Sequence, residues 1–367
     1  MDSISVRNCL MRLPMICRSS LLRAVSVVLI TLLVISCTKP AEESAELHHF
    51  QLFALGTTVS LDFYDVSANK ANNAMQEVTE DLRYMQNAWH PHKPGTLGRV
   101  NQILPLKGSF HTSGSVINLL QAAKPHFTNS EGLFNPAIGQ LIKLWGFHED
   151  EIAIKEPPQA DKIKALVAAK PGLDQIEIKG TAIKGNNDQL LLNFGGFAKG
   201  FGIDLIIEHL REVGIHNAIV NAGGDLRVVG SKGSEPWRIG IKHPRQNGVI
   251  AAINVSGDEA LVTSGDYERF FEYDGKRYHH VLDPRTGYPT TGVQSVTVVH
   301  QSAGAADAIA TALMVAGEKD WPRIAKKMGA RSVMVVLEDG RVQLTEKLQD
   351  RVEFKVQPLP KIDLIKL

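Results

Sequence analysis

Cysteine is nearly absent from this chain. Its 367 residues include three cysteines, Cys9, Cys17 and Cys37, all within the first 37 positions. The remaining residues hold no thiol that could enter a disulfide framework. The fold must therefore be stabilised by its hydrophobic core.

A surplus of charge of either sign is also missing. The chain has 40 Lys and Arg against 39 Asp and Glu, and residues 1–36 hold four Arg and one Asp, so the other residues carry a formal net charge of −2. A nucleic-acid-binding domain usually presents a clustered basic surface. The near-neutral chain, which has no basic run, argues against nucleic acid as a partner.

The N-terminal segment lacks a full membrane span. Residues 24–36 are thirteen residues without a charge, preceded by four arginines and followed by Cys37. This run is short for a span, and its basic flank is typical of a secretory signal. The stretch VISC resembles a bacterial lipoprotein signal. We predict a signal peptide over 1–36, a lipid on Cys37 and a tether over 37–49, with an uncleaved anchor helix as the alternative. The protein would then lie at the periplasmic face of the inner or outer membrane.

The residues after 49 have a globular pattern, and the whole chain is 44% hydrophobic and 22% charged. Strand-like runs alternate with amphipathic helices, of which 69–89 is the clearest. Further helices are expected at 114–129, 136–145, 160–169, 199–213, 304–316 and 320–328, and strands at 53–64, 174–179, 182–185, 189–193, 216–221, 224–229, 236–241, 249–255, 269–273, 277–282, 294–300 and 332–337. Short turns between neighbouring strands favour a single α+β domain over 50–355, with 356–367 as a C-terminal tail.

A glycine pair opens the helix expected at 199–213. In LLLNFGGFAKGFGID, residues 190–204, the glycines stand between an apolar run and Lys199. Freed backbone amides at a helix N-terminus can bind phosphate. The segment is neither a Walker A loop nor Gly-x-Gly-x-x-Gly, because Leu205 stands at the third glycine position. A tight packing turn is an equally good interpretation.

Two further glycine segments and one helix carry polar residues. NAGGD (221–225) predicts a hairpin or a bulge, and TSGDYER (263–269) indicates that another group approaches the backbone closely.

On the helix AADAIATAL (305–313), Asp307 and Thr311 share one face. Both are hard oxygen ligands that suit Mg²⁺, although an Asp in a first helical turn also offsets the helix dipole.

The stretch YHHVLDPRTGY (278–288) contains adjacent histidines. His280 adjoins the turn, and Asp283 could lie within its reach. An imidazole with an ordinary pKa near 6.5 suits a general base at neutral pH. The alternative is that His279 and His280 are half-exposed strand residues. A dinuclear metal site is disfavoured, because no His-Glu-x-x-His or Cys/His spacing accompanies them.

Together these segments resemble, in order and spacing, the ApbE family of FAD:protein FMN transferases. SEGLFNPAIGQLIKLWGF (130–147) is also similar to a segment of that family, and the resemblance covers about residues 50–350. It implies a T-fold-related ApbE-like domain with mixed and antiparallel sheets and flanking helices. It also implies transfer of FMN from FAD, through its phosphate, to a Ser or Thr hydroxyl of another protein, with release of AMP.

The resemblance assigns roles to residues of this chain. His280 would take the hydroxyl proton, and Asp307, Thr311 and the carbonyl of Gly196 would hold Mg²⁺. Lys199 would lie near the phosphates of the substrate FAD. The FAD cleft would be lined by Leu55, Trp89, Phe134, Asn135, Asn193 and the backbone of Val281.

Three positions depart from the family pattern. Trp89 is followed by HPHKPG, whereas the family usually has a different segment before its Arg-x-Asn motif. A role for Trp89 as a core aromatic is therefore as good an interpretation as a role in the FAD cleft. Asn135 and Asn193 stand where the family commonly has Asp. We expect altered affinity for FAD or Mg²⁺ rather than lost activity.

Two other activities fit the same residues. One is a Mg²⁺-dependent FAD pyrophosphatase that gives FMN and AMP. The other is a periplasmic flavin-binding lipoprotein without turnover, although such a carrier needs no reactive histidine or metal ligands. By resemblance alone, the acceptors would be periplasm-facing subunits of NADH:quinone oxidoreductase or other electron-transport complexes.

Overall fold

The structure is a computed structural model that describes residues 46–148 and 151–367. The predicted signal peptide, Cys37 and nearly all of the predicted tether lie outside the described residues. Within the described ranges, no helix is both long and apolar enough to cross a membrane.

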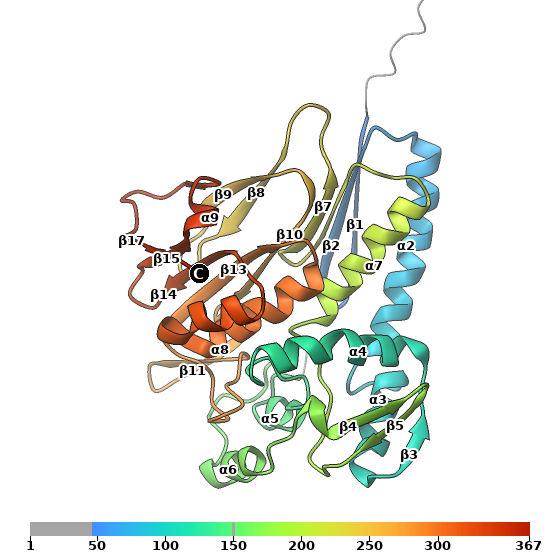
Figure 1. The fold of residues 1–367 in the computed structure, drawn as a ribbon, viewed down its shortest axis with the longest axis vertical. Coiled ribbons are helices and arrows are strands. Elements are labelled where there is room, and N and C mark those ends of the chain that lie inside the picture. The colour runs from blue at the N-terminus through green and yellow to red at the C-terminus, as the bar shows by residue number, and fades with distance from the viewer. Residues whose placement is uncertain (1–45, 149–150) are drawn as a thin grey trace, which may run out of the picture. The chain divides into compact units, whose positions relative to one another are not determined.

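A nine-stranded sheet forms the centre of the described unit (Figure 1). Each pair of neighbours is antiparallel except the last, which is parallel. In spatial order the strands are β1 (Leu47–Ala54), β2 (Thr57–Tyr64), β6 (Ala218–Ala222), β7 (Asp225–Gly230), β10 (Gly257–Gly265), β13 (Val293–His300), β14 (Ser332–Leu337), β15 (Val342–Thr345) and β17 (Ile362–Ile365).

The two faces of this sheet pack against different hydrophobic cores. On β14, Val333 and Val335 join one cluster, whereas Met334 and Val336 join another. Successive side chains of a strand point to opposite faces, so a strand buried on both sides is apolar throughout. This explains why SVMVVL is fully buried.

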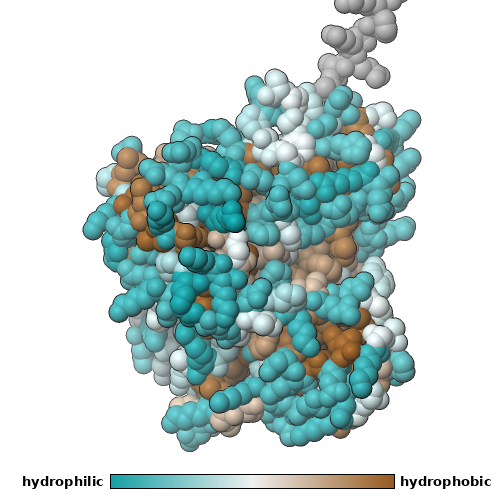
Figure 2. Space-filling model, in the orientation of Figure 1, coloured by the Kyte–Doolittle hydropathy of each residue, from teal (hydrophilic) through white to brown (hydrophobic). Residues whose placement is uncertain are grey.

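Helices cover one face, and a small sheet covers the other. The first layer consists of α2 (Ala68–Trp89), α4 (Gly114–Asn129), α7 (Ala198–Glu212) and α8 (Ala303–Lys327), shown in Figure 1. The second consists of β8 (Trp237–Lys242), β9 (Val249–Val255) and β16 (Val352–Phe354). The surface in Figure 2 is mainly hydrophilic with separate hydrophobic patches, because most large apolar side chains lie inside these layers.

A third core surrounds Trp145. It joins α5 (Gly139–Leu144) and α6 (Ala160–Ala168) to the hairpin of β11 (Phe270–Tyr273) and β12 (Lys276–His279). The remaining elements are α3 (Thr96–Ile103), β3 (Ser109–His111), β4 (Ile176–Lys179), β5 (Ala182–Gly185), α9 (Glu346–Gln349) and the 3₁₀ turns Leu104–Leu106 and Leu173–Gln175.

The α+β class is confirmed, and so is the hairpin at 221–225. β6 and β7 pair through the two-residue turn Gly223–Gly224, where both φ angles are positive, at 66° and 102°. Such a turn matches the twist of an antiparallel pair, and glycine adopts it without strain.

Several boundaries differ from the prediction. No strand forms at 189–193, where Leu191 makes only an isolated bridge to Ile138. β1 begins at Leu47, within the predicted tether, and β17 lies within the predicted tail. The helices expected at 304–316 and 320–328 are joined in α8 across a kink at Gly317, whose φ is 74°.

Trp145 should be the main stabilising residue of the third core. It is fully buried, stacks on Tyr278 with 5.6 Å between ring centroids, and donates from Nε1 to the Gly287 carbonyl at 2.8 Å. We expect Trp145→Ala to lower the free energy of unfolding by about 3–5 kcal/mol. Trp145→Phe keeps an aromatic ring and should cost less. Urea unfolding followed by circular dichroism measures both, and equal losses would contradict this account.

Candidate active site

The N-terminal turns of α7 and α8 meet at glycines. A methyl group on Gly200 would lie 2.2 Å from the carbonyl oxygen of Ala303, and one on Gly196 would lie 2.6 Å from Oγ1 of Thr311. No larger residue fits either position without displacing backbone or side chain. This contact brings Gly196 and Thr311 together, as the resemblance implied.

A lysine and two carboxylates lie at the same contact. The ammonium of Lys199 pairs with Asp225 and lies 3.7 Å from Oδ2 of Asp307. The side chains of Asp225 and Asp307 are 5% and 3% exposed, so both carboxylates are buried. Asp225 follows the Gly223–Gly224 turn and was not among the predicted site residues. The glycine pair before it was the only local signal.

Burial governs the protonation of this group. The pKa of Asp307 is raised to about 7, mainly by burial. The charge of Lys199 opposes this rise, and repulsion from Asp225 adds to it. Burial alone would lower the pKa of Lys199, but Asp225 and Asp307 outweigh it and hold that pKa above its usual range. The two carboxylates therefore share one lysine, and burial favours the protonated form of Asp307.

A hard divalent cation fits this donor set. Asp307 and Thr311 are one turn apart on α8, and Gly196 lies beside Thr311. The Asp307 carboxylate accepts a long hydrogen bond, 3.4 Å, from the amide of Gly200. Among the described residues, no group of three His, Cys, Asp or Glu side chains could hold a metal ion. A carboxylate, a hydroxyl and a carbonyl are instead the mixed oxygen set that Mg²⁺ accepts, with water or phosphate filling the other positions.

The two adjacent histidines have different environments. His279 is buried, and its Nε2 bonds to the carbonyl of Thr290 at 2.9 Å. The backbone amide of His280 donates to the carbonyl of Arg269 at 3.0 Å. Nδ1 is buried in both rings and has no hydrogen-bond partner in the described part of the chain. The ring of His279 is therefore anchored to the fold through its Nε2 atom.

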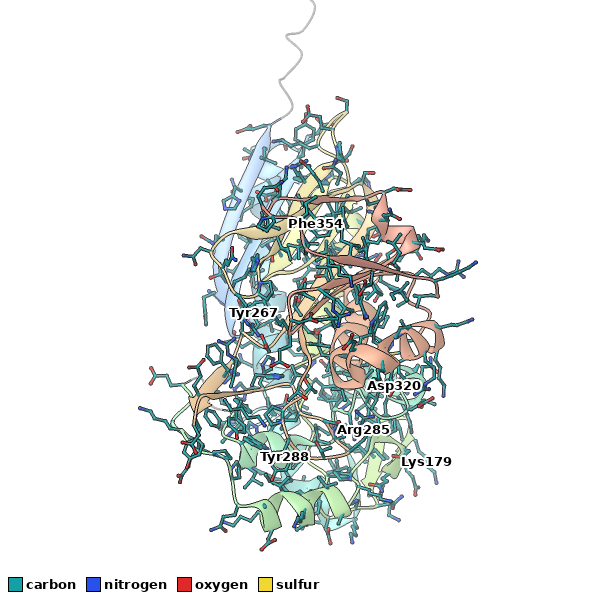
Figure 3. The ribbon with its side chains drawn as sticks, turned by 90° about the vertical axis from the view of Figure 1, so that its left-hand side faces the viewer. Lys179, Tyr267, Arg285, Tyr288, Asp320 and Phe354 are labelled. Carbon is teal, nitrogen blue, oxygen red and sulfur yellow. The ribbon has the colours of Figure 1, made fainter. Side chains whose placement is uncertain are left out.

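Asp283 is not the partner of His280. Its carboxylate is held by the guanidinium of Arg285 at 2.8–3.1 Å, and the same guanidinium donates to the carbonyl of Val315 on α8. Arg285 and Tyr288, labelled in Figure 3, both come from this turn. The carboxylate that was expected to lie within reach of His280 is thus engaged by Arg285 within the DPRTG turn.

Burial, together with the charges of His279, Arg269 and Lys199, lowers the pKa of His280 to about 3. In the protein alone, His280 is neutral throughout the physiological range.

The residues expected to bind FAD fall into two groups. Leu55 and Trp89 are neighbours, since a methyl group on Gly202 would lie 3.5 Å from both. Leu55 adopts a positive φ of 51°, which is unfavourable for a leucine, in the turn between β1 and β2. Trp89 is 6% exposed and donates from Nε1 to Ser115 at 2.8 Å.

The second group consists of Phe134 and Val281, which are also buried. Phe134 is 2% exposed and lies against Phe197, and the carbonyl of Val281 accepts from the amide of Thr290 at 3.0 Å. Their side chains belong to the core, so contacts with a ligand would come from the backbone nearby. Trp89 resembles them in burial, which agrees with its interpretation as a core aromatic.

The two asparagines are used differently. Asn135 donates from Nδ2 to the carbonyl of Pro171 at 2.8 Å and accepts from the amide of Ala137 at 3.0 Å. Asn193 accepts from the amide of Gly195 at 2.9 Å, a role that a carboxylate could also fill. An amide is therefore needed at 135 but not at 193.

The chain is similar to proteins of one family. The ApbE family model matches residues 55–335. An FAD:protein FMN transferase from Rhodobacter capsulatus is 38% identical over 320 residues, which cover 86% of this chain and 60% of that protein. One from Vibrio cholerae is 31% identical over 313 residues, which cover 84% of this chain and 92% of that protein. This chain thus spans about three fifths of the first relative and most of the second.

Solved structures share the fold. The ApbE protein of Thermotoga maritima superposes with a TM-score of 0.76 at 30% identity, covering 83% of this chain and 99% of that one. The flavin transferase ApbE from Vibrio cholerae gives a TM-score of 0.74 at 29% identity, covering 84% and 99%.

Replacing each asparagine by aspartate should separate their roles. In Asn135→Asp, the Nδ2 donor is replaced by an oxygen acceptor that faces the Pro171 carbonyl. Because this hydrogen bond is then lost, we expect the free energy of unfolding to fall by about 1–3 kcal/mol. Asn193→Asp keeps the bond to Gly195 and should retain near wild-type stability while changing FAD or Mg²⁺ affinity. Urea unfolding and FAD titration of both variants test this, and equal stabilities would contradict the assignment.

His280 should make stability depend on acid pH. Because its pKa in the fold is below 6.5, the neutral ring contributes stability that is complete above pH 6.5 and is lost as pH falls towards 3. Relative to His280→Gln, wild type should therefore lose stability on acidification, by at most about 1.4 kcal/mol per pH unit, the effect of one proton. Urea unfolding between pH 4 and 8 measures this, and parallel curves for the two proteins would refute it.

Proposed function

Because the chain belongs to the ApbE family, we propose that it is a Mg²⁺-dependent FAD:protein FMN transferase. One observation carries the proposal. Segments far apart in the sequence bring Lys199, Asp307, Thr311 and the Gly196 backbone to one place, and the charge of Lys199 contributes to the lowered pKa of His280. A flavin carrier has no use for this combination of base, cation ligands and lysine.

The reaction exchanges the phosphoanhydride bond of FAD for a phosphoester bond to the acceptor. The hydroxyl oxygen of an acceptor Ser or Thr attacks the phosphorus of the FMN half of FAD. A P–O bond forms to the acceptor, the bond to the AMP phosphate breaks, and AMP leaves with the bond electrons. His280 takes the hydroxyl proton.

The charges of the chain suit this displacement. Lys199 would provide a positive charge beside the phosphates, and the amide of Gly200, in the first turn of α7, donates to Asp307 in the same region. Asp307, Thr311 and the Gly196 carbonyl would hold Mg²⁺, which supplies neutralisation of the pyrophosphate charge.

The low pKa of His280 limits it as a base in the protein alone. A pyrophosphate brought near the ring adds negative charge, and nearby negative charge raises the pKa of an imidazole. FAD would thereby move His280 towards the range in which general base catalysis is efficient.

Location and acceptor belong to the same proposal. The basic segment, the apolar run 24–36 and Cys37 support a lipid anchor at the periplasmic face of a bacterial membrane. Acceptors there would be periplasm-facing subunits of NADH:quinone oxidoreductase or of other electron-transport complexes.

The adjacent histidines provide a matched test. The full chain in detergent is mixed with FAD, Mg²⁺ and a candidate acceptor domain, and AMP release and flavin fluorescence on the denatured acceptor are followed. His280→Ala should slow labelling by about 10²–10⁴-fold. His279→Gln, which can still donate to Thr290, should label at close to the wild-type rate, and EDTA should stop labelling.

The other outcomes distinguish the alternatives. AMP and FMN without labelled acceptor, across several acceptor domains, would indicate a pyrophosphatase. Bound FAD without AMP would indicate a carrier. Equal effects of the two substitutions would remove the role assigned to His280.

A further inference from the structure

A largely buried carboxylate outside the site holds the N-terminus of α8. Asp204 lies in the second turn of α7 and accepts from Oγ of Ser302 at 2.7 Å, from the amide of Ala303 at 2.8 Å and from the amide of Gly304 at 2.9 Å. Its side chain is 15% exposed. Three of the donors at one helix start thus converge on one side chain of another helix.

The opposite contact is made by Asp307. Its carboxylate, on α8, accepts from the amide of Gly200 in the first turn of α7 at 3.4 Å. Each helix therefore contributes an aspartate to the N-terminal backbone of the other. Since the positive ends of both helix dipoles lie at this contact, both carboxylates are in favourable positions.

A third partner fixes Asp204 itself. The guanidinium of Arg227, 8% exposed on β7, donates to Oδ1 of Asp204 at 2.9 Å and binds Asp258 with its other edge at 2.9 and 3.0 Å. The carboxylate of Asp204 is thus tied to the central sheet and to α8 at once, and it cannot turn away without leaving Arg227.

The position of α8 decides where two of the cation ligands stand. Asp307 and Thr311 lie on its first turns, while Gly196 and Lys199 lie at the start of α7. A shift of α8 along α7 would change the spacing between the two groups of ligands.

We propose that Asp204 is a positioning residue for the cation site: by holding the N-terminus of α8 on α7, it sets the spacing between Gly196 and the pair Asp307 and Thr311. It does not touch the cation or the substrate. The inference rests on the cation site of the proposed function but not on the transfer reaction.

The test measures binding of Mn²⁺ alone to the full chain, by electron paramagnetic resonance of the free ion, without FAD or acceptor. Asp204→Ala should weaken Mn²⁺ binding by about tenfold or more, as loss of groups behind metal ligands does. Asp204→Asn keeps acceptor oxygen and should weaken binding less. In the labelling assay, the Mg²⁺ concentration for half-maximal rate should rise more than the rate at saturating Mg²⁺ falls.

Asp258→Ala is the matched control. It removes a carboxylate from the same arginine, but Asp258 is 38% exposed and pairs with Arg211 and Arg227 rather than with the start of α8. It should change Mn²⁺ affinity by less than about twofold, even if it lowers stability.

Three results would overturn the proposal: wild-type Mn²⁺ affinity in folded Asp204→Ala or Asp204→Asn, equal weakening by Asp258→Ala, or no Mn²⁺ binding by wild type. Failure of the transferase assignment looks different. Wild type would then bind Mn²⁺ in a manner that depends on Asp307 and Asp204 but would label no acceptor.

Discussion

The contact between the first turns of α7 and α8 is the constraint on which the site depends. Helix axes can approach this closely only where side chains are absent, and the chain places glycines at 196, 200 and 304 there. The approach joins the segment after residue 190 to a helix that begins more than a hundred residues later. It thereby sets an oxygen ligand of one helix beside the backbone that precedes the other.

This approach has an electrostatic consequence. Two buried carboxylates, Asp225 and Asp307, share one lysine, and burying such charges usually costs more than their pairing returns. Replacing the group by apolar residues would stabilise many folds. In this fold, the buried group of Asp225, Asp307 and Lys199 is best explained by a charged ligand. Under the proposed function, a divalent cation would supply positive charge and a pyrophosphate would supply negative charge.

The sequence was most informative where local rules decide the structure. The helix expected at 114–129 is α4 to the residue, because Ser113 caps its first turn through Val116, and the glycine pair at 223 and 224 admits only a tight turn. It was misleading at 189–193, where the amide and carbonyl of Leu192 bond to the side chain of Asn101 instead of to a strand. Asp225 and Asp204 were not predicted as functional residues, because their partners lie on other helices and strands. Residue spacing in the sequence does not reveal contacts of this kind.

The histidine pair shows how far the sequence could distinguish neighbours. Strand β12 ends at His279, so the alternation of side chains along a strand does not decide where His280 points. His279 is fixed by its bond to the carbonyl of Thr290, eleven residues away, whereas the pKa of His280 depends on its burial and on the charges of Arg269 and Lys199. Burial is the main reason that His280 is neutral and weakly basic, and those charges add to it. Under the proposed function, a phosphate beside the ring would raise its pKa, which would couple proton transfer to the presence of substrate.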